Sequence, residues 1–205
     1  MNRIGLFGGA FDPPHLAHEA LARAAVEQLQ LDRLHIVPTG HAWHKPLTLS
    51  AAADRLAMCK LAFANLPHVQ VDDRELRRAG HSYTIDTLAE LRAEYPQAEL
   101  FLLIGDDQAA AFHTWQRAPE ILALATLTIA VRADDASANS PFDPKNPLPG
   151  LAPNAARVRI LQLPPMPHSA TQARQLAAAG QPIDHLVAAP VAGYIAKHHL
   201  YRKPA

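Results

Sequence analysis

The densest group of chemically useful residues in the chain is the segment GGAFDPPHLAH, which spans residues 8–18. Gly8 and Gly9 follow a short apolar run, and His15 and His18 lie three residues apart. Glycines let a backbone approach a ligand closely, and the free N–H groups at the start of a helix attract anions. Imidazole N–H groups can stabilise charge that grows on a phosphoryl group in a transition state. The segment therefore predicts a phosphate site that supports phosphoryl chemistry.

Two simpler interpretations of the histidine pair stay open at this point. A His-x-x-His pair often belongs to a solvated helix end, and the chain has 12 histidines, so chance placement is easy. A zinc site is a weaker alternative, because no third ligand follows at a convincing spacing. The chain contains neither the P-loop pattern nor the Gly-x-Gly-x-x-Gly pattern of dinucleotide oxidoreductases.

A second phosphate candidate is the segment SATQAR, which ends at Arg174. Ser169 and Gln172 have the spacing of a capping box, which predicts that Ser169 begins a helix and that Gly180 ends it. Thr171 adds a hydroxyl group, and Arg174 adds a fixed charge one turn inside. Taken alone, such a segment is usually only a capped helix.

Two aspartates, Asp106 and Asp107, follow an unbroken apolar run at residues 100–104. An aspartate at the carboxyl end of a buried strand can accept hydrogen bonds from ribose hydroxyl groups. The pair also fits a metal-binding pair of carboxylates, or a helix with an acidic first turn. The residues alone do not decide among these roles.

The elements that position these residues follow from the alternation of short apolar runs with helical patterns. Strands are predicted at residues 3–7, 34–37, 69–71, 100–104, 127–131 and 158–163. Helices are predicted at residues 17–29, 51–63 with Ser50 as N-cap, and 84–95, where Pro96 stops the helix. This order predicts an α/β fold with a Rossmann-like, doubly wound, mainly parallel sheet and helices on both faces. Ligands of such sheets bind beyond the carboxyl ends of the strands, which is where residues 8–18 lie.

The composition limits the class of protein. With 205 residues, of which 49% are hydrophobic, the chain is expected to form a single domain over residues 1–205. Five prolines between residues 141 and 153 predict a long surface loop at residues 132–157. Lysine plus arginine and aspartate plus glutamate both number 19, which argues against a general nucleic-acid partner. The single Cys59 and the lack of a long apolar stretch predict a cytoplasmic protein without a membrane partner.

The first segment resembles the Gly-Gly-x-Phe-Asp-Pro-x-His-x-Gly-His motif of the nucleotidyltransferase superfamily. Within it, the whole chain resembles the bacterial nicotinate-nucleotide adenylyltransferases, which make deamido-NAD and pyrophosphate from ATP and nicotinate mononucleotide. Further segments match in the right order, namely HKP at 44–46, RELRRAGHSYTIDTL at 74–88, FLLIGDD at 101–107, TW at 114–115, SATQAR at 169–174 and YIAKHHLYR from 194. The resemblance therefore extends over nearly the full length and implies an enzyme of NAD biosynthesis.

The resemblance implies that the protein binds ATP together with Mg²⁺ and takes nicotinate mononucleotide as its second substrate. It also implies roles for individual residues. The implied catalytic residues are His15, His18 and Arg174. The implied ATP-binding residues are Gly8, Gly9, Ala10, Phe11, His15, His18, Gly105, Asp107, Ser169, Thr171 and Arg174. The implied residues for the second substrate are Lys45, Ser82, Tyr83, Thr84 and Trp115. The family spacing selects Asp107 over Asp106 for the ribose contact, and no protein-held metal site is expected.

The chain departs from the family pattern at several positions. Ala17 replaces the usual glycine between the histidines, His168 replaces an apolar residue, Ala170 replaces a second serine, and Arg132 is all that remains of an Arg-Pro-Gly segment. The alternative functions are a pantetheine-phosphate adenylyltransferase and a nucleotide-binding regulator without turnover. The sequence leaves open whether the chain forms a homo-oligomer and how strictly it rejects NMN.

Overall fold

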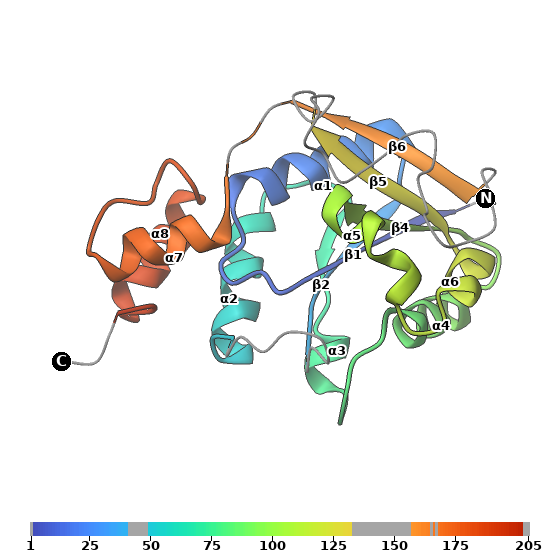
Figure 1. The fold of residues 1–205 in the computed structure, drawn as a ribbon, viewed down its shortest axis with the longest axis horizontal. Coiled ribbons are helices and arrows are strands. Elements are labelled where there is room, and N and C mark those ends of the chain that lie inside the picture. The colour runs from blue at the N-terminus through green and yellow to red at the C-terminus, as the bar shows by residue number, and fades with distance from the viewer. Residues whose placement is uncertain (1, 41–48, 133–156, 165, 167, 203–205) are drawn as a thin grey trace.

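Six strands form one sheet in the computed structural model, which describes residues 2–40, 49–132, 157–164, 166 and 168–202 (Figure 1). The strands are β1 (Arg3–Gly9), β2 (Arg33–Pro38), β3 (Val69–Val71), β4 (Glu99–Gly105), β5 (Thr126–Arg132) and β6 (Val158–Leu163). Their order is β3-β2-β1-β4-β5-β6, and every pair of neighbours is parallel. The predicted Rossmann-like doubly wound sheet is confirmed, and among the described strands it is entirely parallel.

Helices cover both faces of the sheet (Figure 1). One face packs against α1 (Leu16–Leu29) and α2 (Ala52–Phe63), and α7 (Ala170–Ala178) and α8 (Ala189–Lys197) lie beside these two helices and share their core (Figure 1). The other face packs against α4 (Thr84–Glu94), α5 (Asp106–Ala110) and α6 (Ala118–Leu124). A short helix α3 (Arg74–Arg77) precedes α4, and a 3₁₀ turn, Phe112–Thr114, follows α5. None of the helices in the described residues is long and apolar enough to cross a membrane.

Strand β4 is covered on both faces, which explains why its sequence shows no alternation of apolar and polar residues. Phe101 and Leu103 lie in the core beneath α1 and α2, whereas Leu100, Leu102 and Ile104 lie in the core beneath α4 and α6. All five side chains are at most 4% exposed. A strand covered on both faces needs apolar residues at every position, as the run at residues 100–104 predicts.

The centre of the sheet is also the point at which its topology reverses. From β1 the chain crosses through α1 to β2 on one side, and it later returns through α4 to β4 on the other side. The loops that leave β1 and β4 therefore diverge and open a crevice at the carboxyl edge of the sheet. The fold thus brings residues 8–18 beside the Asp106 and Asp107 segment.

The prediction that Ser50 caps the second helix is wrong. Helix α2 begins at Ala52, and Ala51 occupies the N-cap position. The Ser50 N–H donates to Asp12 Oδ2 at 2.9 Å, and the Ser50 carbonyl accepts from Arg55 Nε at 3.1 Å. Ser50 therefore ties its segment to the loop after β1 instead of capping α2. Of the proline-rich segment expected as a loop at 132–157, residues 133–156 lie outside the described residues.

Candidate active site

A cleft of about 730 Å³ lies at the carboxyl edge of the sheet, between the loops that follow β1 and β4. Nearly all of the predicted site residues line it, although they come from segments far apart in the sequence. They are Gly8, Gly9, Ala10, Phe11, His15, His18, Ser82, Tyr83, Thr84, Gly105, Asp107, Trp115, Thr171 and Arg174. Ser169 does not line the cleft but immediately precedes α7, and Lys45 lies outside the described residues.

The two histidines form a stacked pair at the start of α1. His15 is the N-cap residue and His18 lies three residues further along, with ring centroids 3.6 Å apart and ring planes at 18°. The His15 backbone N–H donates to His18 Nδ1 at 3.1 Å. Because Nδ1 accepts this bond, the hydrogen-bond pattern assigns the proton of neutral His18 to Nε2. His18 therefore has an N–H donor available for a ligand.

Burial keeps both imidazoles neutral in the free protein. It lowers the pKa of His15 from 6.5 to about 4, and nearby His168 adds to the effect. Burial also lowers the pKa of His18 well below its usual value, with His15 as the second cause. A buried cation without a partner is costly, so the neutral ring is the stable form. In the free protein these side chains are therefore hydrogen-bonding groups without a permanent charge.

The lowered pKa values predict that the protein loses stability in mild acid. Between pH about 4 and 6.5 the unfolded chain takes up protons that folded His15 does not, so the free energy of unfolding falls as the pH decreases. Once the pH is well below 4, the lowered pKa of His15 alone should have reduced the free energy of unfolding by about 3 kcal/mol. Urea unfolding at pH 7.5 and 5.0 measures it, and His15→Asn should lose part of the pH dependence. The same substitution at exposed His113 should not; equal slopes in all three proteins would contradict the prediction.

Phe11 shapes the floor of the cleft between the glycines and the histidines. Its backbone has φ of +47°, and its ring packs edge-on against Phe7 at 5.3 Å and His18 at 5.0 Å between centroids. A Cβ atom at Gly9 would lie 3.1 Å from the Phe11 ring, whereas one at Gly8 would meet only the Val37 carbonyl, at 4.0 Å. The glycine at position 9 therefore admits Phe11, and the glycine at position 8 leaves room at the cleft wall.

Helix α7 presents its N-terminus and one arginine to the same cleft. Ser169 caps the helix as predicted, with its hydroxyl oxygen accepting from the Gln172 N–H at 3.1 Å. Gly180, with φ of +69°, follows its last turn. Arg174 Nη1 donates to the Asp12 carbonyl at 2.7 Å, and Nη2 donates to Thr171 Oγ1 at 3.2 Å. The guanidinium group is thus held at the cleft while part of its fork remains available.

The two aspartates after β4 have different surroundings. Asp106 is buried, and its Oδ1 accepts from the Asp107 N–H at 3.0 Å, inside the first turn of α5. Asp107 is exposed to the cleft, where its Oδ2 accepts from Gln108 Nε2 at 3.2 Å. Asp107 is therefore the carboxylate that a ligand can reach.

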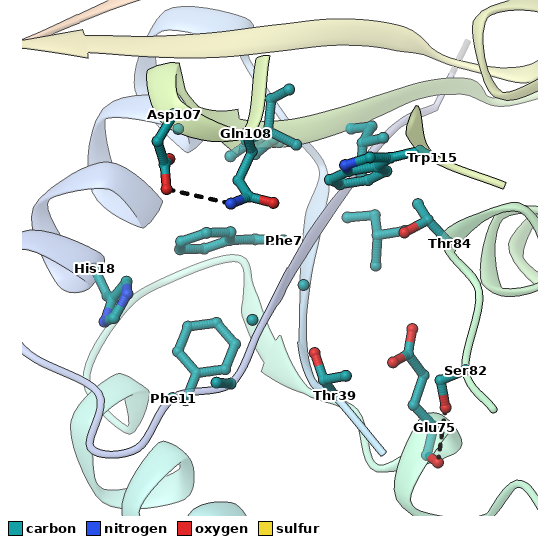
Figure 2. Close-up of a pocket in the computed structure, with 18 of the residues that line it drawn as sticks. Phe7, Phe11, His18, Thr39, Glu75, Ser82, Thr84, Asp107, Gln108 and Trp115 are labelled. Carbon is teal, nitrogen blue, oxygen red and sulfur yellow. Dashed lines mark hydrogen bonds between the residues drawn. The ribbon is translucent and has the colours of Figure 1, made fainter. Parts of the chain in front are cut away.

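The far end of the cleft is aromatic and contains a helix N-terminus. His18 and Asp107 lie at one end, whereas Trp115 and Thr84 lie at the other (Figure 2). Tyr83 is the N-cap residue of α4 and Thr84 is its first residue, so the N-terminal end of this helix, which attracts anions, lies here. Trp115 packs on Phe112 with 5.3 Å between ring centroids and also lines the cleft. This end suits a flat ring that carries an anionic group.

The cleft is also lined by polar residues to which the sequence reasoning gave no role, among them Asp12, Thr39, Glu75 and Gln108. Glu75 is 7% exposed, and its carboxylate accepts from Thr87 Oγ1 at 2.8 Å. Burial raises the pKa of Glu75, opposed by that hydrogen bond. The only sequence signal for Glu75 was its place in the RELRR segment, where charged neighbours make it look like a surface residue.

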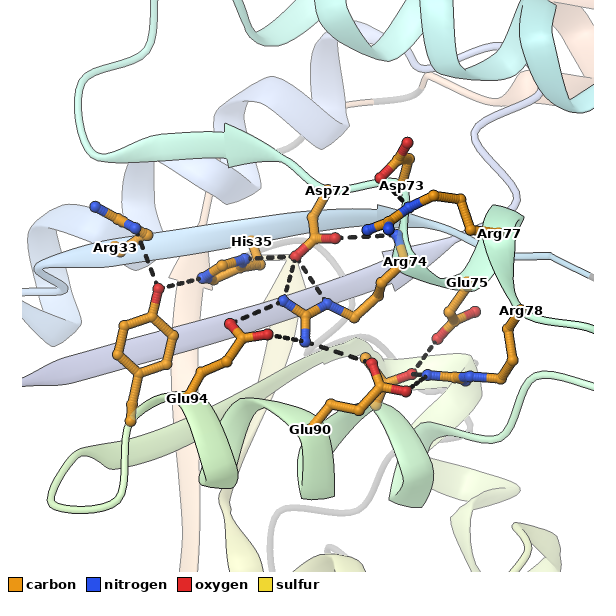
Figure 3. Close-up of polar contacts among 12 residues, drawn as sticks. Arg33, His35, Asp72, Asp73, Arg74, Glu75, Arg77, Arg78, Glu90 and Glu94 are labelled. Atoms are coloured by element: carbon orange, nitrogen blue, oxygen red, sulfur yellow. Dashed lines mark hydrogen bonds and ion pairs between the residues drawn. The ribbon is translucent and has the colours of Figure 1, made fainter.

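Ion pairs join α3 and the residue that follows it, Arg78, to α4 (Figure 3). Arg74 binds Asp72 at 2.7 Å and Glu94 at 3.0 Å, and Arg78 binds Glu90 at 2.6 Å. Burial alone would raise the pKa of Asp72, but hydrogen bonds from His35 and Arg74 outweigh burial and hold it below its usual range. Asp72 is therefore ionised at neutral pH, where it pairs with Arg74.

Comparison with known proteins identifies the class. The family model described as cytidylyltransferase-like matches residues 6–176. A nicotinic acid mononucleotide adenylyltransferase from Plasmodium falciparum, solved in complex with NaAD, superposes with a TM-score of 0.77 at 18% identity, covering 98% of both chains. A putative nicotinate-nucleotide adenylyltransferase from Vibrio parahaemolyticus has a TM-score of 0.68 at 20% identity, covering 100% of this chain and 98% of that one. The fold is thus that of a nucleotidyltransferase.

Sequence relatives give the family within this class. A probable nicotinate-nucleotide adenylyltransferase from Albidiferax ferrireducens is 52% identical over 98% of this chain and 99% of its own length. Another from Chromobacterium violaceum is 39% identical over 98% and 99%. The chain belongs to the nicotinate-nucleotide adenylyltransferase family.

Proposed function

We propose that the protein transfers the adenylyl group of ATP to nicotinate mononucleotide, which yields deamido-NAD and pyrophosphate. The observation that carries this proposal is the division of one cleft into a phosphate end and an aromatic end. His18, Arg174 and the start of α7 form the first, and Trp115 and the start of α4 form the second. Membership of the family supports the same reaction.

In the proposed reaction a phosphate oxygen of nicotinate mononucleotide attacks the α-phosphorus of ATP. A new phosphorus–oxygen bond forms, the bond from the α-phosphorus to the bridging β-oxygen breaks, and pyrophosphate leaves. A phosphate monoester has a second pKa near 6 and is largely ionised at pH 7, so no strong general base is needed. The protein contributes by positioning the reactants and by donating hydrogen bonds to the developing charge.

The phosphate end supplies three kinds of donor to this charge. His18 offers its Nε2–H, α7 offers the N–H groups that precede Gln172, and Arg174 offers the unused part of its guanidinium fork. His15 lines the cleft beside His18 and is assigned to the same phosphate position. We assign Gly8, Gly9, Ala10, Phe11, Gly105 and Thr171 to the walls around ATP and Asp107 to its ribose.

Magnesium enters this proposal as part of the ATP substrate. The described residues hold no group of three or more His, Cys, Asp or Glu side chains placed to bind a metal ion. Mg²⁺ is commonly bound through phosphates and water, so the proposal requires no cage of protein carboxylates.

The aromatic end is proposed to bind the nicotinate group. The pyridine ring stacks on Trp115, and its carboxylate accepts hydrogen bonds from the first N–H groups of α4 near Tyr83 and Thr84. Ser82, which is buried and donates to the Glu75 carbonyl at 3.5 Å, holds the turn before α4. Lys45 remains a predicted contact of this substrate.

Replacing Trp115 with alanine should raise KM for nicotinate mononucleotide about tenfold, because stacking of a base on an aromatic ring contributes about 1–3 kcal/mol. KM for ATP should change little, since the adenylyl group binds at the other end of the cleft. Steady-state kinetics with each substrate varied in turn measures both values. Trp115→Phe should retain part of the affinity, and an unchanged KM in Trp115→Ala would refute the stacking role.

We further propose that residues 1–205 act as one domain in the cytoplasm, where ATP is available. The packing of α7 and α8 on the same core as α1 and α2 supports a single unit. The buried free thiol of Cys59 is compatible with a reducing compartment.

Pyrophosphate release tests the proposed function. Purified protein receives ATP and Mg²⁺ with nicotinate mononucleotide, NMN or phosphopantetheine in separate reactions. We expect release with nicotinate mononucleotide and much less with the other two. Preference for phosphopantetheine would point to the pantetheine-phosphate enzyme, and ATP binding without release from any acceptor would point to a regulator.

A further inference from the structure

The loop after β1 is held in place by an aspartate that the proposed chemistry does not use. Asp12 is 5% exposed, and each of its carboxylate oxygens has a partner from a distant segment. Oδ2 accepts from the Ser50 N–H at 2.9 Å, and Oδ1 accepts from the Tyr201 hydroxyl at 2.6 Å. Asp12 therefore links the loop that carries His15 to the chain before α2 and to the segment after α8.

Two arginines hold the backbone of the same loop. Arg174 Nη1 donates to the Asp12 carbonyl at 2.7 Å, and Arg55 Nη1 donates to the Ala10 carbonyl at 3.0 Å. Arg55 is 3% exposed, and burial lowers its pKa against the opposing effect of Asp12. Because Arg174 is itself proposed to bind phosphate, a shift of the loop at Asp12 would also move this guanidinium group.

Tyr201 is an unusual residue to find in such a link. It lies three residues after His198, the C-cap of α8, and has φ of +67°, a conformation that few residues other than glycine adopt. Burial raises the pKa of its hydroxyl group, and the hydrogen bond to Asp12 raises it further. The hydroxyl thus stays protonated and is a hydrogen-bond donor at neutral pH.

We propose that Asp12 and Tyr201 are positioning residues, through which the segment after α8 completes the adenylyl-transfer site. They touch no reacting atom; they hold residues 10–15 so that His15, His18 and Arg174 converge on one phosphate position. This inference rests on the proposed function and extends it to the segment after α8, of which no described residue lines the cleft.

The chain contains a matched control for a test of this role. Tyr194, in α8, donates its hydroxyl to Asp54 Oδ1 at 2.9 Å, so it also bonds a carboxylate from the C-terminal segment. That bond reaches α2 and not the loop. Tyr201→Phe and Tyr194→Phe therefore remove the same atom and the same type of bond at two places.

Tyr201→Phe is expected to lower kcat about tenfold, the effect of losing one buried hydrogen bond to a charged group. KM for nicotinate mononucleotide should stay within about twofold, because the aromatic end is untouched. Tyr194→Phe should keep kcat within about twofold. Thermal unfolding of both variants shows whether each is folded at the assay temperature. If Tyr201→Phe is not folded at that temperature, Asp12→Asn serves as the second variant.

A double-mutant cycle identifies the link itself. If Asp12 and Tyr201 act together, Asp12→Asn combined with Tyr201→Phe should lower kcat hardly more than Asp12→Asn alone. Asp12→Asn combined with Tyr194→Phe should be additive. Equal kcat in Tyr201→Phe and Tyr194→Phe, or full additivity in the first pair, would overturn the proposal.

Failure of the proposed function would look different. A wild-type protein that releases no pyrophosphate would contradict that function, and ATP affinity by titration calorimetry would then test the link without turnover. Weaker ATP binding by Tyr201→Phe than by Tyr194→Phe supports the positioning role. If turnover is absent and the two variants bind ATP with equal affinity, the positioning role of Tyr201 is contradicted.

Discussion

His18→Asn should lose about 10²–10³-fold in kcat while keeping its fold, the typical effect of removing one donor to a developing negative charge. Asparagine places an oxygen where Nδ1 now accepts from the His15 N–H, so the start of α1 keeps its hydrogen bond. It lacks a donor at the Nε2 position. The expected loss therefore isolates the N–H that the proposal directs at phosphate.

Two further substitutions at His18 separate chemistry from packing. His18→Gln extends an amide donor toward the Nε2 position but gives up the Nδ1 acceptor, so it should retain more activity than His18→Asn. His18→Ala loses both and also the ring contacts with Phe11 and His15, so it should be at least as impaired. Initial rates at saturating substrates, with circular dichroism as a check on folding, measure the series. Normal turnover by folded His18→Asn would exclude the donor role.

Arg174→Met should lower kcat/KM for ATP about 100-fold, the second large effect that we expect. The variant loses a charge-assisted phosphate contact and also the bond to the Asp12 carbonyl. Arg174→Lys keeps the charge but not the fork, so it should recover only part of the loss.

Arg77 supplies the matched control for Arg174. It lies on α3, its side chain is 70% exposed, and it pairs with Asp73 at 2.9 Å, away from the cleft. Arg77→Met should leave kcat/KM unchanged, because exposed ion pairs contribute little. If Arg174→Met behaved like Arg77→Met, the assignment of Arg174 to the phosphate end would be wrong.

Local patterns in the sequence predicted the main elements well, because each pattern reports a local physical requirement. The run at residues 100–104 is apolar throughout because β4 is covered on both faces. The segment from Ser169 to Gly180 carries its own start and stop signals, and α7 lies between them. The spacing of three residues alone predicted that the side chains of His15 and His18 lie close together, and their rings stack in the structure.

Features that depend on distant contacts could not be predicted in this way. Ser50 has the right chemistry for an N-cap, but its backbone is engaged by Asp12 and Arg55 instead. The bond between Tyr201 and Asp12 joins residues 189 positions apart, and no local pattern indicates it. Short helices such as α3 and α5 hold too few residues to show a periodicity.

Some candidate site residues were likewise indicated by the sequence, whereas others depend on contacts that only the tertiary structure shows. Asp107 was separated from Asp106 by the family spacing; in the structure Asp106 is buried and Asp107 is exposed, and the ribose contact of Asp107 stays a prediction. Glu75 was missed, because its charged neighbours Arg74 and Arg77 suggest a solvated helix. Its burial arises from contact with Thr87 on α4, which only the tertiary structure brings close.

A crystal structure of the protein with deamido-NAD bound tests the central claim most directly, since this single molecule reaches both ends of the cleft. The account predicts the phosphates within hydrogen-bond distance of His18 Nε2 and the first N–H groups of α7, with the pyridine ring stacked on Trp115. A dinucleotide bound in the reverse direction, or outside the cleft, would contradict the account.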